Sequence, residues 1–107
     1  MSDLEWVTIC RESAIKRNDV MRFDRGEHTY AVVRTSEGIC SVIDGVCTHA
    51  KAHLAEGFVD GKIIECPKHN GRFDCLTGEA VATPALVAVR VYETRVEDEM
   101  IQARLFS

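Results

Sequence analysis

The sequence predicts an all-β fold, built as one small domain of antiparallel strands. Helical periodicity is nearly absent from the 107 residues, and short apolar runs recur between turn residues such as Gly, Asn and Asp. The C-terminal part also alternates apolar and polar residues at the period of a strand. A chain of this length forms a single domain with a modest core.

Four strands are predicted in the N-terminal part of the chain. The connection 11–18, after the first strand, has room for one helical turn. The turn Arg25-Gly26-Glu27 joins the second strand to the third, and Thr35–Gly38 joins the third to the fourth, so these strands form consecutive hairpins. The four strands are Leu4–Cys10, Val20–Asp24, Thr29–Arg34 and Ile39–Ile43.

The C-terminal part is expected to close the fold with one more hairpin. Leu86–Val96 is predicted as a strand because its valines alternate with other residues, and a bulge is expected at Arg95–Val96, where the alternation breaks. The turn Glu97-Asp98-Glu99 then leads into a strand over Met100–Leu105. The residues of this last strand that should face inward are Ile101, Ala103 and Leu105.

Two short motifs supply the chemistry of the chain: Cys47-Thr48-His49 and Cys66-Pro67-Lys68-His69. Each motif pairs one thiolate with one imidazole. A centre of two irons and two sulfides can be bound so that one iron takes both Cys and the other takes both His. We therefore expect Cys47 and Cys66 to hold an inner iron, and His49 and His69 to hold an outer one.

A structural zinc ion is the main alternative for the same four side chains. Zinc ligands usually occur in pairs two to four residues apart, with tetrahedral closure. The Cys-x-His spacing of the first motif is tighter than that, and both motifs mix thiolate with imidazole. The pattern favours iron over zinc.

These motifs resemble those of the Rieske ferredoxins of bacterial multicomponent ring-hydroxylating oxygenases. The resemblance extends over nearly the whole chain. It rests on Cys47-Thr48-His49, on Cys66-Pro67-Lys68-His69-Asn70-Gly71-Arg72-Phe73-Asp74 and on Thr77-Gly78; Thr83-Pro84 fits the family's third loop.

The resemblance implies an antiparallel β-sandwich of the Rieske fold, with a cluster-binding subdomain inserted at about residues 44–74 of the single domain 1–107. The residues Arg72–Asp74 are themselves predicted as a strand that returns to the scaffold. The implied cofactor is one Rieske [2Fe–2S] cluster, held by Cys47, His49, Cys66 and His69. The implied role is that of an electron carrier without a catalytic site of its own. It would pass single electrons from an NAD(P)H-dependent flavin reductase to a terminal Rieske non-haem iron oxygenase in the breakdown of aromatic compounds.

The family pattern also predicts a low redox potential. High-potential Rieske proteins carry a further Cys in each motif, joined as a disulfide, and the matching positions here are Ala52 and Lys68. We expect the potential to be near the low end of the range of roughly −150 to +300 mV. Backbone N–H groups of residues 48–51 and 68–71 are candidate donors to the sulfurs, and Pro84 is a candidate cover for the third side of the cluster.

The remaining cysteines and His53 are given no role in metal binding. Cys10, Cys40 and Cys75 are expected to stay reduced, the first two as small buried hydrophobes and the third near the cluster. His53 lies between the two motifs and is expected on the loop surface, with a contact at the rim of a docking site as the second possibility.

Composition limits the partners that we expect. A net charge of −4 argues against nucleic acid binding, and no apolar run is long enough to cross a bilayer. We expect a cytoplasmic monomer. Two other functions remain open from the sequence: the small subunit of an assimilatory nitrite reductase and a zinc-stabilised binding module.

Overall fold

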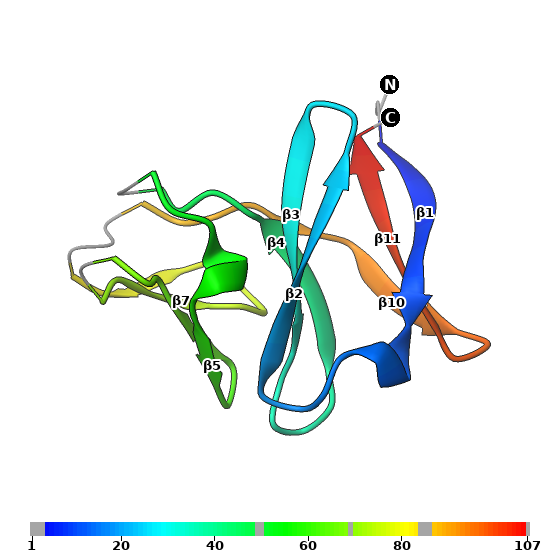
Figure 1. Cartoon of the computed structure of the whole chain (residues 1–107), viewed down its shortest axis with the longest axis horizontal. Coiled ribbons are helices and arrows are strands. Elements are labelled where there is room, and N and C mark those ends of the chain that lie inside the picture. Colours follow the sequence, from blue (N-terminus) through cyan, green and yellow to red (C-terminus); the bar gives the residue numbers. More distant parts are fainter. Residues whose placement is uncertain (1–3, 49–50, 69, 84–86, 107) are drawn as a thin grey trace.

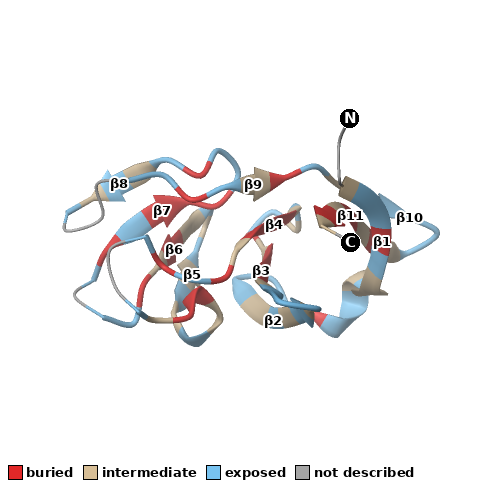
Figure 2. Ribbon diagram, turned by 90° about the horizontal axis from the view of Figure 1, so that it is seen from above, coloured by how far each residue is buried: buried red, intermediate tan, exposed pale blue. Residues whose placement is uncertain are grey.

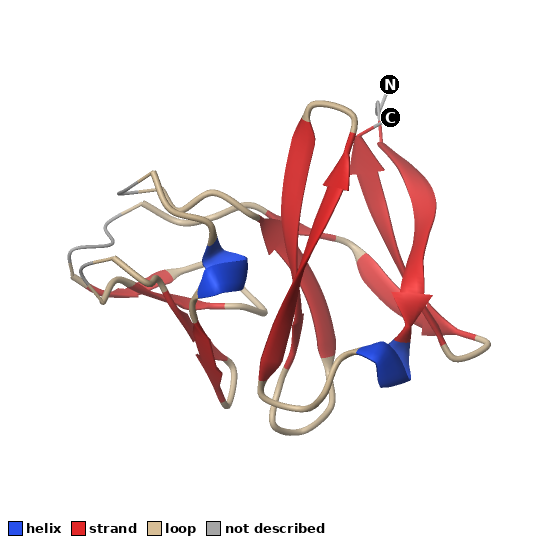
Figure 3. Ribbon diagram, viewed as in Figure 1, coloured by secondary structure: helices blue, strands red, loops and turns tan. Residues whose placement is uncertain are grey.

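The computed structural model describes residues 4–48, 51–68, 70–83 and 87–106. In these residues, strands dominate and the helical elements are two short 3₁₀ turns, η1 (Glu12–Ala14) and η2 (Leu54–Glu56) (Figures 1 and 3). The strands are β1 (Leu4–Arg11), β2 (Asp19–Arg25), β3 (His28–Arg34), β4 (Cys40–Asp44), β5 (Phe58–Asp60), β6 (Ile63–Glu65), β7 (Arg72–Asp74), β8 (Ala80–Ala82), β9 (Val91–Tyr92), β10 (Thr94–Glu97) and β11 (Met100–Phe106).

Two antiparallel sheets form a sandwich. One has the strand order β1-β11-β10, and the other, the central sheet, has the order β2-β3-β4-β9. Their inner faces share a buried core to which both contribute, so the predicted antiparallel β-sandwich is confirmed. The core residues are Val7, Ile15, Tyr30, Val32, Val42, Tyr92, Ile101, Ala103 and Leu105, and they include all three residues predicted to face inward from the last strand.

The predicted hairpins are also confirmed. Arg25 pairs with His28, which leaves a turn of Gly26 and Glu27, and Gly26 has the positive φ of 59° that such a turn favours. The closing hairpin of β10 and β11 turns through Asp98 and Glu99, whose φ angles are 52° and 68°. The 3₁₀ turn η1 occupies the connection in which one helical turn was predicted.

A third sheet, the small sheet, has the order β5-β6-β7-β8 and packs beside the sandwich (Figures 1 and 2). Its strand β7 pairs with β6 and β8. The predicted strand Arg72–Asp74 is confirmed with these bounds, but it is an inner strand of the small sheet and does not return to the scaffold.

The central sheet is buried on both faces. Along β3, Tyr30 and Val32 face the core of the sandwich, whereas Ala31 and Val33 face a second core under the small sheet. A strand buried on both sides needs a continuous apolar run, and this explains why the run in β3 shows no polar alternation.

The prediction of one strand over Leu86–Val96 was wrong. Residues 84–86 lie outside the described residues, and residues 87–90 are irregular. Val87 is 64% exposed, whereas Val89 is buried and donates its backbone N–H to the carbonyl of Gly78. Beyond this segment, β9 pairs with β4 and β10 pairs with β11, so the chain changes sheets at Glu93.

The bulge expected at Arg95–Val96 is not observed. Both residues pair in register with β11, so the break in alternation reflects the change of sheets rather than an extra residue. The register of β1 against β11 shifts instead between Thr8 and Cys10. No helix within the described residues has the length and apolar character needed to cross a membrane.

Candidate metal centre

The first motif begins a loop whose base is a short antiparallel pairing. The backbone N–H of Cys47 donates to the carbonyl of Ala52 (2.9 Å), and the N–H of Leu54 donates to the carbonyl of Gly45 (2.7 Å). Val46 and His53 form the bridge between these bonds. The base of this first ligand loop, residues 45–47 and 52–54, is therefore ordered by main-chain hydrogen bonds.

The second motif follows β6 directly, and Asn70 and Gly71 separate it from β7. The N–H of Cys66 donates to the carbonyl of Gly71 (2.7 Å), which closes the loop between the two strands. Asn70 has a φ of 58°, a left-handed conformation that Asn adopts more readily than most residues. The second ligand loop is thus held by a rigid hairpin of the small sheet.

The two loops bring the thiols of Cys47 and Cys66 together. Both side chains are buried, at 4% and 0% exposure, and both are free of disulfides. Burial raises the pKa of the Cys66 thiol, a hydrogen bond from the backbone N–H of Lys68 opposes this rise, and the adjacent Cys47 raises the pKa further. A metal that displaces both protons would remove this penalty, so the pair fits the thiolate half of a metal site.

The two imidazoles of the predicted ligand set, His49 and His69, lie outside the described residues. Within the described part of the chain, no group of three or more His, Cys, Asp or Glu side chains could hold a metal ion. The structure therefore places the sulfur half of the predicted set, and the roles of His49 and His69 stay predictions.

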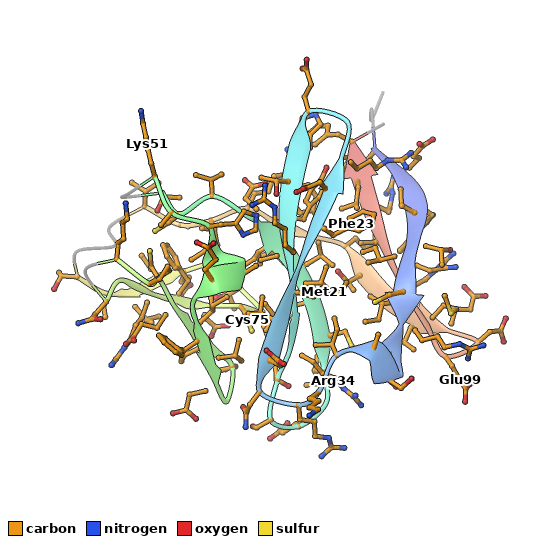
Figure 4. The ribbon with its side chains drawn as sticks, viewed as in Figure 1. Met21, Phe23, Arg34, Lys51, Cys75 and Glu99 are labelled. Carbon is orange, nitrogen blue, oxygen red and sulfur yellow. The ribbon has the colours of Figure 1, made fainter. Side chains whose placement is uncertain are left out.

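Cys75 lies at the opposite end of the β6–β7 hairpin from Cys66, because its N–H donates to the carbonyl of Lys62 before β6 (2.8 Å), whereas Cys66 follows the end of β6. The expectation that Cys75 lies near the cluster is therefore not borne out. Its side chain belongs to the same buried core as the thiols of the two motifs and lies between the small sheet and the central sheet (Figure 4). Burial raises the pKa of its thiol to about 11, and the neighbouring Asp74 adds to this effect. Cys75 is therefore a neutral thiol in the structure, and its carbonyl accepts a hydrogen bond from the Ser41 hydroxyl (2.6 Å).

Cys10 and Cys40 are free and only partly buried, at the edge of the sandwich core. The Cys40 thiol donates a long hydrogen bond to the Glu12 carboxylate (3.9 Å). Burial raises the pKa of Cys40 to about 11, and Glu12 contributes to this rise. Both side chains pack against the sandwich core, but they are not the fully buried residues that were predicted.

The third loop contacts the first through Thr48, whose hydroxyl donates to the carbonyl of Val87 (2.6 Å). Pro84, the candidate cover, lies outside the described residues. Lys51 extends away from the molecule at this end (Figure 4), and both Lys51 and Lys68 are exposed. The end that carries the two motifs therefore presents positive charge on a chain whose net charge is −4.

The prediction for His53 was wrong. Its side chain is buried, at 8% exposure, and it forms two hydrogen bonds. The imidazole Nδ1 accepts from the backbone N–H of Ala55 (3.0 Å), and Nε2 is 2.8 Å from the Thr29 hydroxyl. The prediction of an exposed side chain considered only the loop around His53. The partner Thr29 lies 24 residues earlier in the chain, so nothing in the loop sequence indicated this contact.

Comparison with known proteins decides the nature of the centre. The sequence profile of the Rieske [2Fe–2S] domain matches residues 5–93. The chain belongs to the Rieske [2Fe–2S] domain family. Its cofactor is one Rieske-type cluster, and this excludes the zinc alternative.

This Rieske protein is an electron carrier of the ferredoxin type. It is 34% identical over 96 residues to the ferredoxin component of the 2,4-dinitrotoluene dioxygenase system of Burkholderia sp. (strain RASC), an alignment that covers 86% of this chain and 92% of the relative. A solved complex of reduced oxygenase and oxidized ferredoxin in carbazole 1,9a-dioxygenase contains a chain with a TM-score of 0.87 and 31% identity, and 92% of each chain is covered.

The small subunit of an NADH-dependent nitrite reductase from Mycobacterium tuberculosis has the same fold. Its TM-score is 0.84 with 20% identity, and the alignment covers 97% of each chain. At this identity the likeness establishes the fold alone, and it adds no support for the nitrite reductase alternative.

Proposed function

We propose that this chain is the ferredoxin component of a multicomponent ring-hydroxylating oxygenase system. It accepts single electrons from an NAD(P)H-dependent flavin reductase and delivers them to a terminal Rieske non-haem iron oxygenase. The observation that carries this proposal is the buried contact between Cys47 and Cys66 at the base of two loops, in a chain that aligns almost end to end with ferredoxin components.

Four residues would hold the cluster: Cys47 and Cys66 on the inner iron, and His49 and His69 on the outer one. Residues at about 44–74 would act as a cluster-binding subdomain of one domain, and β8 (Ala80–Ala82) completes its small sheet. Support comes from its separate core, which contains both thiols, and from the hairpin that closes the second loop. When bound, the cluster supplies one-electron chemistry without an open coordination position.

Residues of the chain itself keep water away from the two cysteine sulfurs and hold them in place. Cys47 and Cys66 are buried among apolar side chains, and the backbone N–H of Lys68 donates to the Cys66 sulfur. Such donors stabilise negative charge on sulfur and so raise the potential, whereas full burial lowers it. Exposed Lys51 and Lys68 give the loop end a local positive charge that can orient docking against acidic groups of a partner.

The test is electron transfer with the flavin reductase and terminal oxygenase encoded beside the gene of this chain. The purified protein should be red-brown, lose colour with NAD(P)H only when the reductase is present, and regain it anaerobically when oxidised oxygenase is added. Stable co-purification with a large sirohaem subunit, without reduction by a flavin reductase, would contradict the proposal in favour of nitrite reduction.

We further propose that the protein works in the cytoplasm as a monomer. The five cysteines form no disulfide in the structure, and this supports a reducing compartment, since a secreted domain of this size usually pairs its cysteines. A carrier that presents one loop end to two successive partners needs no second subunit. Light scattering coupled to gel filtration should give the mass of one chain; a dimer mass would contradict this.

A further inference from the structure

His53 connects the first ligand loop to a different part of the fold. Its backbone lies in the base of the loop, where it bridges Val46. Its side chain reaches Thr29 at the start of β3 in the β2–β3 hairpin. A second, main-chain contact joins the same two regions, because the N–H of Gly45 donates to the carbonyl of Thr29 (3.0 Å).

The hydrogen bonds define one tautomer of the ring. Since the N–H of Ala55 donates to Nδ1, that nitrogen carries the lone pair and Nε2 carries the proton. Nε2–H then donates to the Thr29 oxygen, and the Thr29 hydroxyl donates its own proton to the Asp24 carboxylate (2.5 Å). Asp24 in turn accepts from the Arg22 guanidinium (3.0 Å). We call the series Ala55, His53, Thr29 and Asp24 the His53 link.

The fit around the ring leaves no room for another residue at position 45. A Cβ at Gly45 would collide with Nε2 and Cε1 of His53, so glycine is required here by close approach and not by its backbone angle. The His53 ring, the loop base and the hairpin are therefore packed as one unit.

We propose that His53 is a positioning residue for the cluster: as a neutral imidazole it fixes the base of the first ligand loop to the β2–β3 hairpin. Cys47 belongs to this base, and its N–H donates to the carbonyl of Ala52, the residue before His53. A shift of the base would displace Cys47 from Cys66. The link thus holds Cys47 against the rigid sandwich.

The link depends on pH because only the neutral ring can accept the Ala55 N–H. Burial lowers the pKa of His53, the nearby Arg22 lowers it further, and the carboxylates of Asp24 and Glu56 oppose the shift. The folded pKa is thus below the unfolded value. The contribution of His53 to stability is complete above the ordinary histidine pKa of about 6.5 and is lost as the pH falls through the folded pKa.

Two matched substitutions test the link in the cluster-loaded protein. Thr29→Val keeps the branched shape of the side chain and removes the hydroxyl, whereas Thr29→Ser keeps the hydroxyl. Loss of this hydrogen bond should speed amide hydrogen exchange in the peptide 45–55 by about 5–30-fold, with no change in the sandwich strands, and should speed cluster release by a similar factor. Thr29→Ser should behave as the unmodified protein does.

His53→Asn provides a second measurement. Asn can accept the Ala55 N–H as a cap but is too short to reach Thr29, so exchange in the peptide 45–55 should be fast already at neutral pH. Between about pH 7 and about pH 5 the protection factor of this peptide, which is the intrinsic exchange rate at each pH divided by the observed rate, should fall in the unmodified protein and should stay constant in His53→Asn. Equal exchange and equal cluster release in Thr29→Val and Thr29→Ser would overturn the proposal, as would identical pH profiles for His53→Asn and the unmodified protein.

Discussion

Removal of the Phe73 ring should destabilise the cluster-binding half of the protein far more than the sandwich. Phe73 is completely buried in the core that contains Cys47 and Cys66, and it pairs with Ile64 across β6 and β7. Phe73→Ala removes the favourable free energy of burying the ring away from water and leaves a cavity. Together these effects should lower the free energy of unfolding by about 3–5 kcal/mol. A domain of this size has a free energy of unfolding of about 5–15 kcal/mol, so the loss is a large part of the total.

The same chain offers a matched control. Phe58 belongs to the same small sheet but is 67% exposed, so Phe58→Ala makes the same chemical change at a solvated position. We expect Phe58→Ala to change stability by no more than about 0.5 kcal/mol.

Thermal unfolding followed by circular dichroism, together with visible absorbance for cluster release, measures both effects. At about 4–8 °C per kcal/mol, Phe73→Ala should lower the midpoint by about 12–40 °C, and cluster release should precede loss of the strand signal. Equal losses for the two variants, or a loss of less than about 1 kcal/mol for Phe73→Ala, would refute the assignment of this core as the support of the thiol pair.

Three other outcomes are expected. Because Ala52 and Lys68 cannot form the disulfide of high-potential Rieske proteins, a redox titration should give a midpoint near the low end of the range of about −150 to +300 mV; a strongly positive value would contradict this. Replacing His69 with Cys should change the EPR spectrum of the reduced cluster from the Rieske type, whose average g is below that of all-Cys clusters, and an unchanged spectrum would exclude His69 as a ligand. The pKa of Asp74 is lowered: burial acts against this, but hydrogen bonds from the backbone N–H groups of residues 76 and 77 and the Lys62 ammonium prevail. The stability contributed by Asp74 should therefore be complete above about pH 3.8 and be lost as the pH falls through the lowered folded pKa. Below about pH 3.8, the urea unfolding of Asp74→Asn should therefore depend less on pH than that of the unmodified protein.

The sequence predicted those parts of the fold in which local pattern and tertiary burial agree. The last strand alternates and packs one face on the sandwich core, and each predicted hairpin has turn residues at the observed positions. The two motifs predicted that Cys47 and Cys66 come together, and the structure brings their thiols into contact from a loop after β4 and a loop after β6.

The errors arose where a distant contact decides the structure. Val87 to Val91 alternate like a strand, but the N–H of Val89 bonds to a turn at Gly78, so no ladder forms before the chain changes sheets. His53 is a polar residue in a loop, and its burial depends on Thr29, which no local pattern connects to it. His49 and His69 lie outside the described residues, so their part in the site stays a prediction.

Because both faces of the central sheet are buried, the sheet separates two hydrophobic cores. Adjacent residues of β3 therefore belong to different cores: a substitution at Ala31 disturbs the core with Cys47 and Cys66, and one at Val32 disturbs the core shared with β1 and β11. The core that contains Cys47 and Cys66 is completed by side chains of the central sheet, namely Ala31, Val33 and Ile43. An excised fragment that contains only the small sheet would expose that apolar surface to water, so the electron-carrying half cannot be separated from its scaffold.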